Sequence, residues 1–275
     1  MRLNRSLSFR SRKLNAPRQN PRPSHNARIA THLASRISTL YKLAEGSEAV
    51  FGSPLGPFDE GAVSHYLPHF VYFGSHQSSA ALSLAVLAGF NREELPAVRA
   101  QLALIEELIK QPDIWRGINV SFFPVANVRG LLGEGGSRDL LGEHWGRSLE
   151  PEIRLIHQYS KQQGYQGFLR IASTSDREAS ALVRSVLSTT AHPTGVEVFS
   201  STDFDPWPVR FEAASQSLVA GGPLSFSGDP AFAPFEVELA LPADWPQSRW
   251  DRELSRHLKR LIISYRGFQA YGQHL

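Results

Sequence analysis

The sequence predicts a single α/β domain in which helices cover both faces of a twisted, mostly parallel mixed sheet. Six of the seven residues from Leu82 to Ala88 are apolar. This run is too continuous for a strand with one face in water, and it is typical of a strand buried on both faces. A glycine turn and a long helix pattern follow it, and strand–turn–helix units of this kind build parallel sheets. At 275 residues the chain is long enough to form one large domain.

The charge pattern separates a basic arm, residues 1–25, from the domain, residues 26–275. Residues 1–44 contain ten Lys or Arg and no acidic residue, so 29 − 10 = 19 basic against 26 acidic residues remain in 45–275, a net charge of −7. We expect the arm to be flexible, and its charge would suit an acidic partner.

The amino-terminal half of the domain begins with apolar residues at helical spacing, which predict a helix over residues 26–44. The glycine and proline content of residues 49–68 predicts loops with a short strand at the start. A strand over residues 69–73 and a turn over residues 74–79 lead to the buried strand at Leu82.

The middle of the chain continues the alternation of helices and strands. A helix over residues 93–110 has one apolar face and ends before Pro112. The next strand covers residues 118–125, and a glycine-rich connection of about 24 residues follows, a length that is usually functional. Glu150-Pro151-Glu152 has the proline and carboxylates that favour a helix start.

The last third of the chain shows two more strand patterns and two more helix patterns. We predict a strand over residues 167–172 and a helix over residues 175–187 with a serine or aspartate cap. Residues 200–234 are rich in Ser, Pro and Gly, which indicates loops. A strand over residues 235–241 and an amphipathic helix over residues 247–265 end the domain.

Composition excludes several classes of function. The chain has no cysteine, which excludes disulfides, thiolate metal ligands and a cysteine nucleophile. No window approaches the roughly 18 to 20 uninterrupted apolar residues of a membrane span, and no signal peptide is visible. We therefore expect a cytoplasmic protein without a membrane span.

The position of the buried strand indicates where a site should lie. In open α/β sheets, ligands bind at the carboxyl ends of such strands. Asn91, Glu93 and Glu94 follow this strand directly. A second interpretation stays open, in which the two glutamates only favour the start of their helix through its dipole.

Two motifs carry a resemblance to a known family. The turn after the buried strand reads Gly89-Phe90-Asn91-Arg92-Glu93-Glu94-Leu95, and the end of the next strand reads Phe123-Pro124-Val125-Ala126-Asn127-Val128-Arg129-Gly130. Over residues 67–265 the order of motifs resembles the zinc carboxypeptidase superfamily, in the branch of succinylglutamate desuccinylase and aspartoacylase-like proteins.

The resemblance implies roles for four residues of this chain. Glu94 matches the zinc-binding glutamate of the family pattern Gly-Ile-His-Gly-Asp-Glu-Pro, and Asn91 stands where that pattern has a zinc-binding histidine. Asn127 belongs to the pattern Pro-Val-x-Asn-Pro-x-Gly, which shapes the loop after the strand. Ala172 stands at the place of the third zinc ligand, which is a histidine in the family.

The resemblance also locates the substrate and catalytic positions. The family's Asp-Leu-Asn-Arg, which holds a substrate carboxylate, aligns with residues 139–142, where both binding residues are missing. A shifted register places Arg147 in the arginine position. The catalytic glutamate corresponds to Glu238 in one register of the late strand and to Ala240 in the other.

These departures remove most of a zinc site. A catalytic zinc normally has three protein ligands and one position open for water. Glu94 is the one ligand that remains, and the amide oxygen of Asn91 is a poor substitute for imidazole. We therefore expect a degenerate member of the family without a cofactor, which binds a small molecule or peptide in a cleft lined by Asn91, Glu94, Arg147 and Ala172.

The alternative is an active zinc-dependent carboxypeptidase or amidohydrolase with unconventional ligands. In that case Glu94 would act with His76 or His144. His65, His69 and His76 fall within twelve residues and offer another metal cluster, although they are expected more simply as loop and strand histidines.

Overall fold

The computed structural model describes residues 25–60, 63–74, 82–115, 117–132, 150–185, 198–214 and 235–272. The predicted basic arm up to residue 24 lies outside these residues, as do His76, His144 and Arg147. In the described part of the chain, no helix has both the length and the apolarity of a membrane span.

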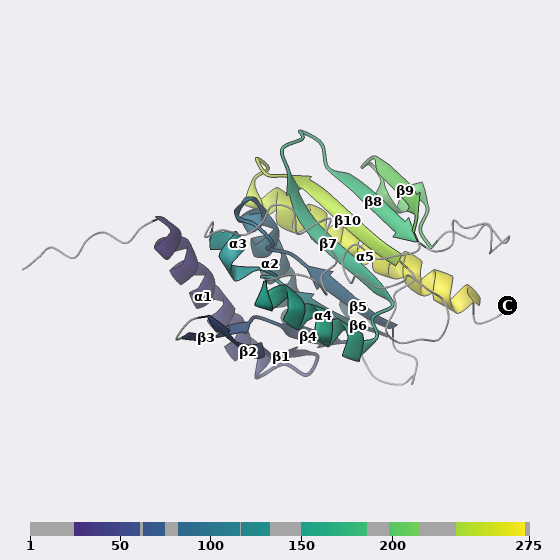
Figure 1. Cartoon of the computed structure of the whole chain (residues 1–275). Coiled ribbons are helices and arrows are strands. Elements are labelled where there is room, and N and C mark those ends of the chain that lie inside the picture. Colours follow the sequence, from purple (N-terminus) through teal and green to yellow (C-terminus); the bar gives the residue numbers. More distant parts are fainter. Residues whose placement is uncertain are drawn as a thin grey trace, which may run out of the picture.

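An eight-stranded mixed sheet forms the centre of the molecule, in the order β1-β4-β6-β5-β7-β10-β8-β9 (Figure 1). The strands are β1 (Val50–Gly52), β4 (Phe70–Phe73), β5 (Leu82–Leu87), β6 (Ile118–Phe123), β7 (Gly167–Thr174), β8 (Ser180–Ser185), β9 (Val209–Ala213) and β10 (Phe235–Pro242). The four central strands β6, β5, β7 and β10 are parallel to one another. Antiparallel pairs join β1, β4 and β6 on one side, and β10 to β8 on the other, while β9 is parallel to β8.

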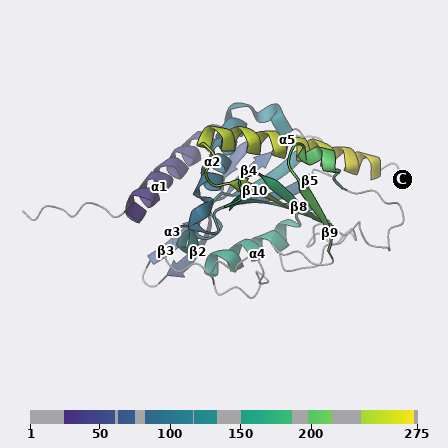
Figure 2. The same ribbon diagram turned by 90° about the horizontal axis from the view of Figure 1, so that it is seen from above.

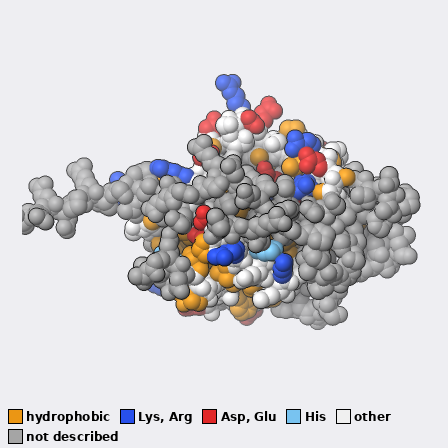
Figure 3. All heavy atoms as spheres, viewed as in Figure 1, with side chains coloured by type: hydrophobic (Ala, Val, Ile, Leu, Met, Phe, Trp, Pro, Cys, Tyr) orange, Lys and Arg blue, Asp and Glu red, His pale blue; other side chains and the backbone are white. Residues whose placement is uncertain are grey.

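Helices cover both faces of this sheet, as the sequence predicted. Helices α1 (His25–Ala44), α2 (Leu95–Lys110) and α5 (Gln247–Gly272) lie on one face, and α4 (Pro151–Gln163) lies on the other (Figure 2). The shorter helices are η1 (Arg92–Glu94), η2 (Pro112–Trp115), α3 (Val128–Leu132) and η4 (Ser201–Phe204). Basic and acidic side chains both appear among the described residues on the face shown in Figure 3.

The apolar run of β5 is explained by the two cores that it separates. Leu84 and Val86 pack in the core under α1, α2 and α5, whereas Ala85 and Leu87 pack in the core under α4. All four side chains are at most 1% exposed. Successive side chains of a strand point to opposite faces, so a strand in the middle of the sheet has no face left for polar residues.

Gly89 sets the path of the chain after β5. Its φ of +74° lies in the left-handed region, and a Cβ at this position would approach the Pro124 carbonyl oxygen to 2.7 Å. Backbone hydrogen bonds from Ala126 to Ala88 and from Asn127 to Gly89 then hold the turns after β5 and β6 together. Only glycine combines this φ with so close an approach, and the turn places η1 at the carboxyl end of the sheet.

The predicted helix over residues 175–187 is wrong. Residues 175–178 form an exposed bend, and residues 180–185 form strand β8, antiparallel to β10. Ala181, Val183 and Ser185 are buried while the residues between them are partly exposed, which is the period of two of a strand. The sequence reasoning also missed β9 and the hairpin of β2 (Leu55–Glu60) and β3 (Val63–Leu67), which form a separate two-stranded sheet.

Candidate functional site

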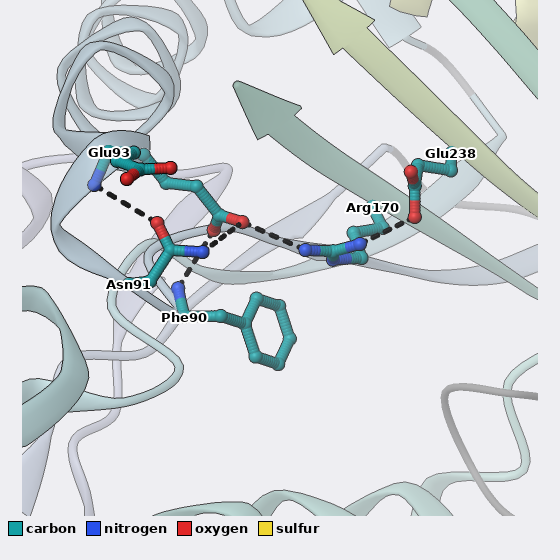
Figure 4. Close-up of polar contacts among 6 residues, drawn as sticks. Phe90, Asn91, Glu93, Arg170 and Glu238 are labelled. Carbon is teal, nitrogen blue, oxygen red and sulfur yellow. Dashed lines mark hydrogen bonds and ion pairs between the residues drawn. The ribbon is translucent and has the colours of Figure 1, made fainter. Parts of the chain in front are cut away.

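Glu94 is buried at the carboxyl end of β5, where η1 turns its side chain inward. The residue is 1% exposed. Its Oε2 accepts a hydrogen bond from the Phe90 backbone N–H at 2.8 Å, and its Oε1 accepts one from the Asn91 Nδ2 at 3.3 Å (Figure 4). Asn91 Oδ1 accepts from the Glu93 N–H at 3.0 Å, so Asn91 caps η1 and orients the Glu94 carboxylate together.

Arg170 lies between two carboxylates. Its Nη2 donates to Glu94 Oε1 at 2.8 Å, and its Nη1 donates to Glu238 Oε2 at 2.5 Å (Figure 4). The guanidinium carbon also lies 5.0 Å from the centre of the Phe90 ring. One planar cation therefore connects the turn after β5 with the strand β10.

The sheet register explains this arrangement. Arg170 of β7 is paired with Glu238 of β10 on one side and with Leu87 of β5 on the other. Paired residues of neighbouring strands point to the same face, so the two charged side chains leave the sheet together. This is the face covered by α4. The pair lies close to Glu94, which follows the carboxyl end of β5 and contacts Arg170.

The charges of this group depend on one another. Glu94 and Arg170 have side chains only 2% and 4% exposed, while the Glu238 side chain is 36% exposed. Burial raises the pKa of Glu94, and the Arg170 guanidinium and the Phe90 N–H oppose that rise. An isolated buried charge costs several kcal/mol, so Arg170 is the counterion that stabilises a carboxylate at this depth.

The donor set at this place does not fit a zinc ion. Ala172, which the sequence resemblance predicts at the position of the third zinc ligand, is buried and paired with Ala240 across β7 and β10. A methyl group donates no electron pair to a metal. Among the described residues no group of three or more His, Asp or Glu could hold a metal ion, and the cation that bridges Glu94 and Glu238 is a guanidinium.

The remaining predicted site residues have different surroundings. Asn127 is fully buried, and its Oδ1 accepts a hydrogen bond from the Gly130 N–H at 2.8 Å, which fits its predicted role in shaping the loop. His69 is also buried, with Nδ1 2.9 Å from the Ser53 carbonyl oxygen. The His65 ring stacks on Phe58 instead. Neither histidine belongs to a metal-binding group of described residues.

Sequence reasoning missed Arg170. The signal that could have revealed it was a charge in the otherwise apolar strand Gly167-Phe168-Leu169-Arg170-Ile171-Ala172. An arginine is almost never fully buried unless it is paired. A strand predicted to lie in the centre of the sheet therefore requires a carboxylate near this arginine, and Glu94 and Glu238 were both candidates.

Comparisons with known proteins identify the fold. No protein-family profile and no curated protein matches this chain, but solved structures do. A protein described as a metallopeptidase from Shewanella baltica matches with a TM-score of 0.58 and 14% identity, over 85% of this chain and 91% of its own. A metallo-carboxypeptidase from Burkholderia cenocepacia matches with a TM-score of 0.61 and 12% identity, over 85% and 69%.

A third match is the carboxypeptidase A of Helicoverpa armigera, with a TM-score of 0.58 and 15% identity, over 86% of this chain and 72% of its own. At such low identity the likeness concerns the fold alone. The chain therefore has the fold of the metallocarboxypeptidases, as the order of its motifs predicted.

Proposed function

We propose that this protein is a carboxypeptidase-like binding or regulatory protein that does not carry out zinc-dependent hydrolysis. The observation that carries the proposal is the Arg170 guanidinium, which bridges Glu94 and Glu238. By the resemblance, Glu94 corresponds to a zinc ligand, and Glu238 corresponds to the catalytic glutamate in one of the two registers of the late strand, the other register placing Ala240 there. Arg170 then takes the place of the metal as the positive charge of the site.

A guanidinium cannot perform the chemistry of zinc. Zinc accepts a water molecule in its open position and lowers the pKa of that water to about 7. A guanidinium has no acceptor orbital, donates fixed hydrogen bonds and keeps its proton at any physiological pH.

Binding remains possible at the same place. The Glu238 side chain is about one-third exposed, so a small molecule or peptide can reach it from solvent. Two carboxylates and one guanidinium leave a net charge of −1 if both carboxylates are ionised. The resemblance points further to the succinylglutamate desuccinylase and aspartoacylase-like branch as the origin of this cleft.

The test is the metal content of the full-length protein purified from zinc-supplemented cells. We expect far less than one zinc per chain by elemental analysis, and the same urea midpoint with and without chelator. Carboxypeptidase and N-acyl amino acid substrates should be hydrolysed no faster than in buffer.

A rebuilt variant provides the positive control. Asn91→His and Ala172→His, combined with Arg170→Ala, restore the His, Glu, His donor set and should bind zinc in a Glu94-dependent manner. Stoichiometric zinc in the natural protein that is lost on Glu94→Ala would instead favour an active hydrolase, in which Glu94 acts with His76 or His144.

A further inference from the structure

A pocket lies beside the amino-terminal half of α5, and neither Arg170 nor its two carboxylate partners line it. It has a volume of about 340 Å³. Three connections form its walls: the turn between β7 and β8, the connection from η4 to β9, and the connection from β10 to α5. The side chains that define it are Arg177, Glu178, Trp207, Trp245, Arg249 and Glu253.

The walls of this pocket are fixed by contacts within the fold. Trp207 is 8% exposed, and its ring stacks on His257 of α5 with centroids 3.4 Å apart. Arg260 Nη1 donates to the Asp205 carbonyl oxygen at 2.8 Å, which ties the same connection to α5. On the other side, the Ala181 N–H donates to the Pro208 carbonyl oxygen at 2.9 Å. The pocket is therefore formed before any ligand arrives, which lowers the entropy lost on binding.

Positive charge exceeds negative charge in this pocket. Glu253 is neutralised by Arg256, whose Nη2 lies 2.5 Å from its Oε2. Arg177 and Arg249 form no ion pair with any described residue, and Glu178 is the one acid left to oppose them. Unpaired arginines that face a pocket are suited to a carboxylate or a phosphate.

Aromatic surface lies beside these charges. The Arg249 guanidinium lies 3.6 Å from the centre of the Trp245 ring. This stacking orients the guanidinium, and Pro206 and Pro208 add apolar surface to the lining of the pocket. A ligand that filled the pocket would meet flat apolar surface and two cationic groups together.

We propose that this pocket binds a small aromatic monoanion, a planar ring that carries one carboxylate or one singly charged phosphodiester group. The ring would pack against the tryptophan and proline surfaces, and the anionic group would accept hydrogen bonds from Arg177 and Arg249. Glu178 disfavours a second negative charge. The proposal does not depend on the chemistry of the Arg170 site, because no residue of the pocket belongs to the Glu94–Arg170–Glu238 group.

Isothermal titration of the full-length protein tests the proposal with three probes. Indole-3-acetate supplies the ring with a carboxylate, and methyl phenyl phosphate, a diester with one negative charge, supplies it with a phosphate. Indole-3-acetamide is the neutral counterpart of indole-3-acetate. We expect at least one anion to bind and the amide to bind at least tenfold more weakly. A hydrogen bond to a charged group contributes about 1.5–3 kcal/mol, which is roughly ten- to a hundredfold in Kd.

Matched variants locate the site. Arg249→Ala and Arg177→Ala should each weaken the anion about tenfold or more, whereas Arg266→Ala removes the same charge from an exposed part of α5 outside the pocket and should change Kd less than about twofold. The variants should keep the wild-type urea midpoint.

Three outcomes would overturn the proposal. The first is the absence of binding heat for both anions at millimolar concentration. The second is equal affinity for the acid and the amide, because the arginines would then have no role. The third is an equal effect of Arg249→Ala and Arg266→Ala, which would indicate general charge attraction rather than this pocket.

Discussion

Replacement of Arg170 by methionine measures how strongly the guanidinium stabilises the buried Glu94. Methionine keeps the unbranched apolar stem of the side chain and removes the guanidinium, which lies over the Phe90 ring. The Glu94 carboxylate would lose its counterion at 1% exposure. Removal of one partner of a buried ion pair costs about 3–5 kcal/mol, and we expect a loss of that size in the free energy of unfolding at neutral pH.

The structure also ranks the partner substitutions. Glu238→Gln acts on a side chain that is 36% exposed, so we expect a loss of about 1 kcal/mol or less. Glu94→Gln leaves Arg170 paired with Glu238, so it should lower the free energy of unfolding by less than Arg170→Met does. The double variant Arg170→Met with Glu94→Gln removes both buried charges, and its loss should be smaller than the sum of the two single losses by about 0.5–3 kcal/mol.

Urea unfolding followed by circular dichroism, with chelator present throughout, provides these free energies. Equal m-values would show that the variants unfold from a similarly compact state. The reasoning is refuted if Arg170→Met loses less than about 1 kcal/mol, or if the losses of the two single variants add in the double variant.

Three further predictions concern the frame around the site. Burial lowers the pKa of His69 from 6.5 to about 4. Below pH 6.5 the unfolded chain takes up a proton at this histidine and the folded chain does not. The free energy of unfolding should therefore fall by about 3 kcal/mol in total as the pH is lowered to about 4. Urea midpoints measured across this pH range check the prediction. Between pH 7 and pH 4 the midpoint of His69→Phe should fall less than that of the natural protein. Gly89→Ala should lower the free energy of unfolding by about 1–3 kcal/mol, because residue 89 has a φ of +74° and a Cβ there would lie 2.7 Å from the Pro124 carbonyl oxygen. Gly267→Ala is the control: this helix position in α5 has no neighbour within 4 Å, so the free energy of unfolding should stay the same or rise by up to about 1 kcal/mol. Asn91→Ala removes the side chain that caps η1, so the free energy of unfolding should fall by about 1 kcal/mol. An unchanged thermal midpoint would contradict this role of Asn91.

The sequence was informative wherever a local pattern decided the structure. The apolar run of β5 and the glycine that follows it predicted a central strand and a tight turn, because burial on both faces and a left-handed backbone each leave a local trace. The segment of β8 was misread as a helix. Its cross-strand partners lie in β10 and β9, and pairing between distant segments overrode the local preference.

The site was predicted in part for the same reason. Glu94 and Asn91 lie in one short turn, and their motif identified them. Arg170 is separated from Glu94 by 76 residues and from Glu238 by 68. Which strands are neighbours, and in which register, decides this contact, and neither follows from the residues of one strand alone.

The cation between Glu94 and Glu238 is covalently part of the chain. A metal ion exchanges with the solution, so the charge of a metal site follows the supply of that metal and is removed by a stronger chelator. The charge of Arg170 is made when the protein is synthesised and stays for the life of the molecule. The positive charge that Arg170 places between Glu94 and Glu238 is therefore independent of the supply of any metal.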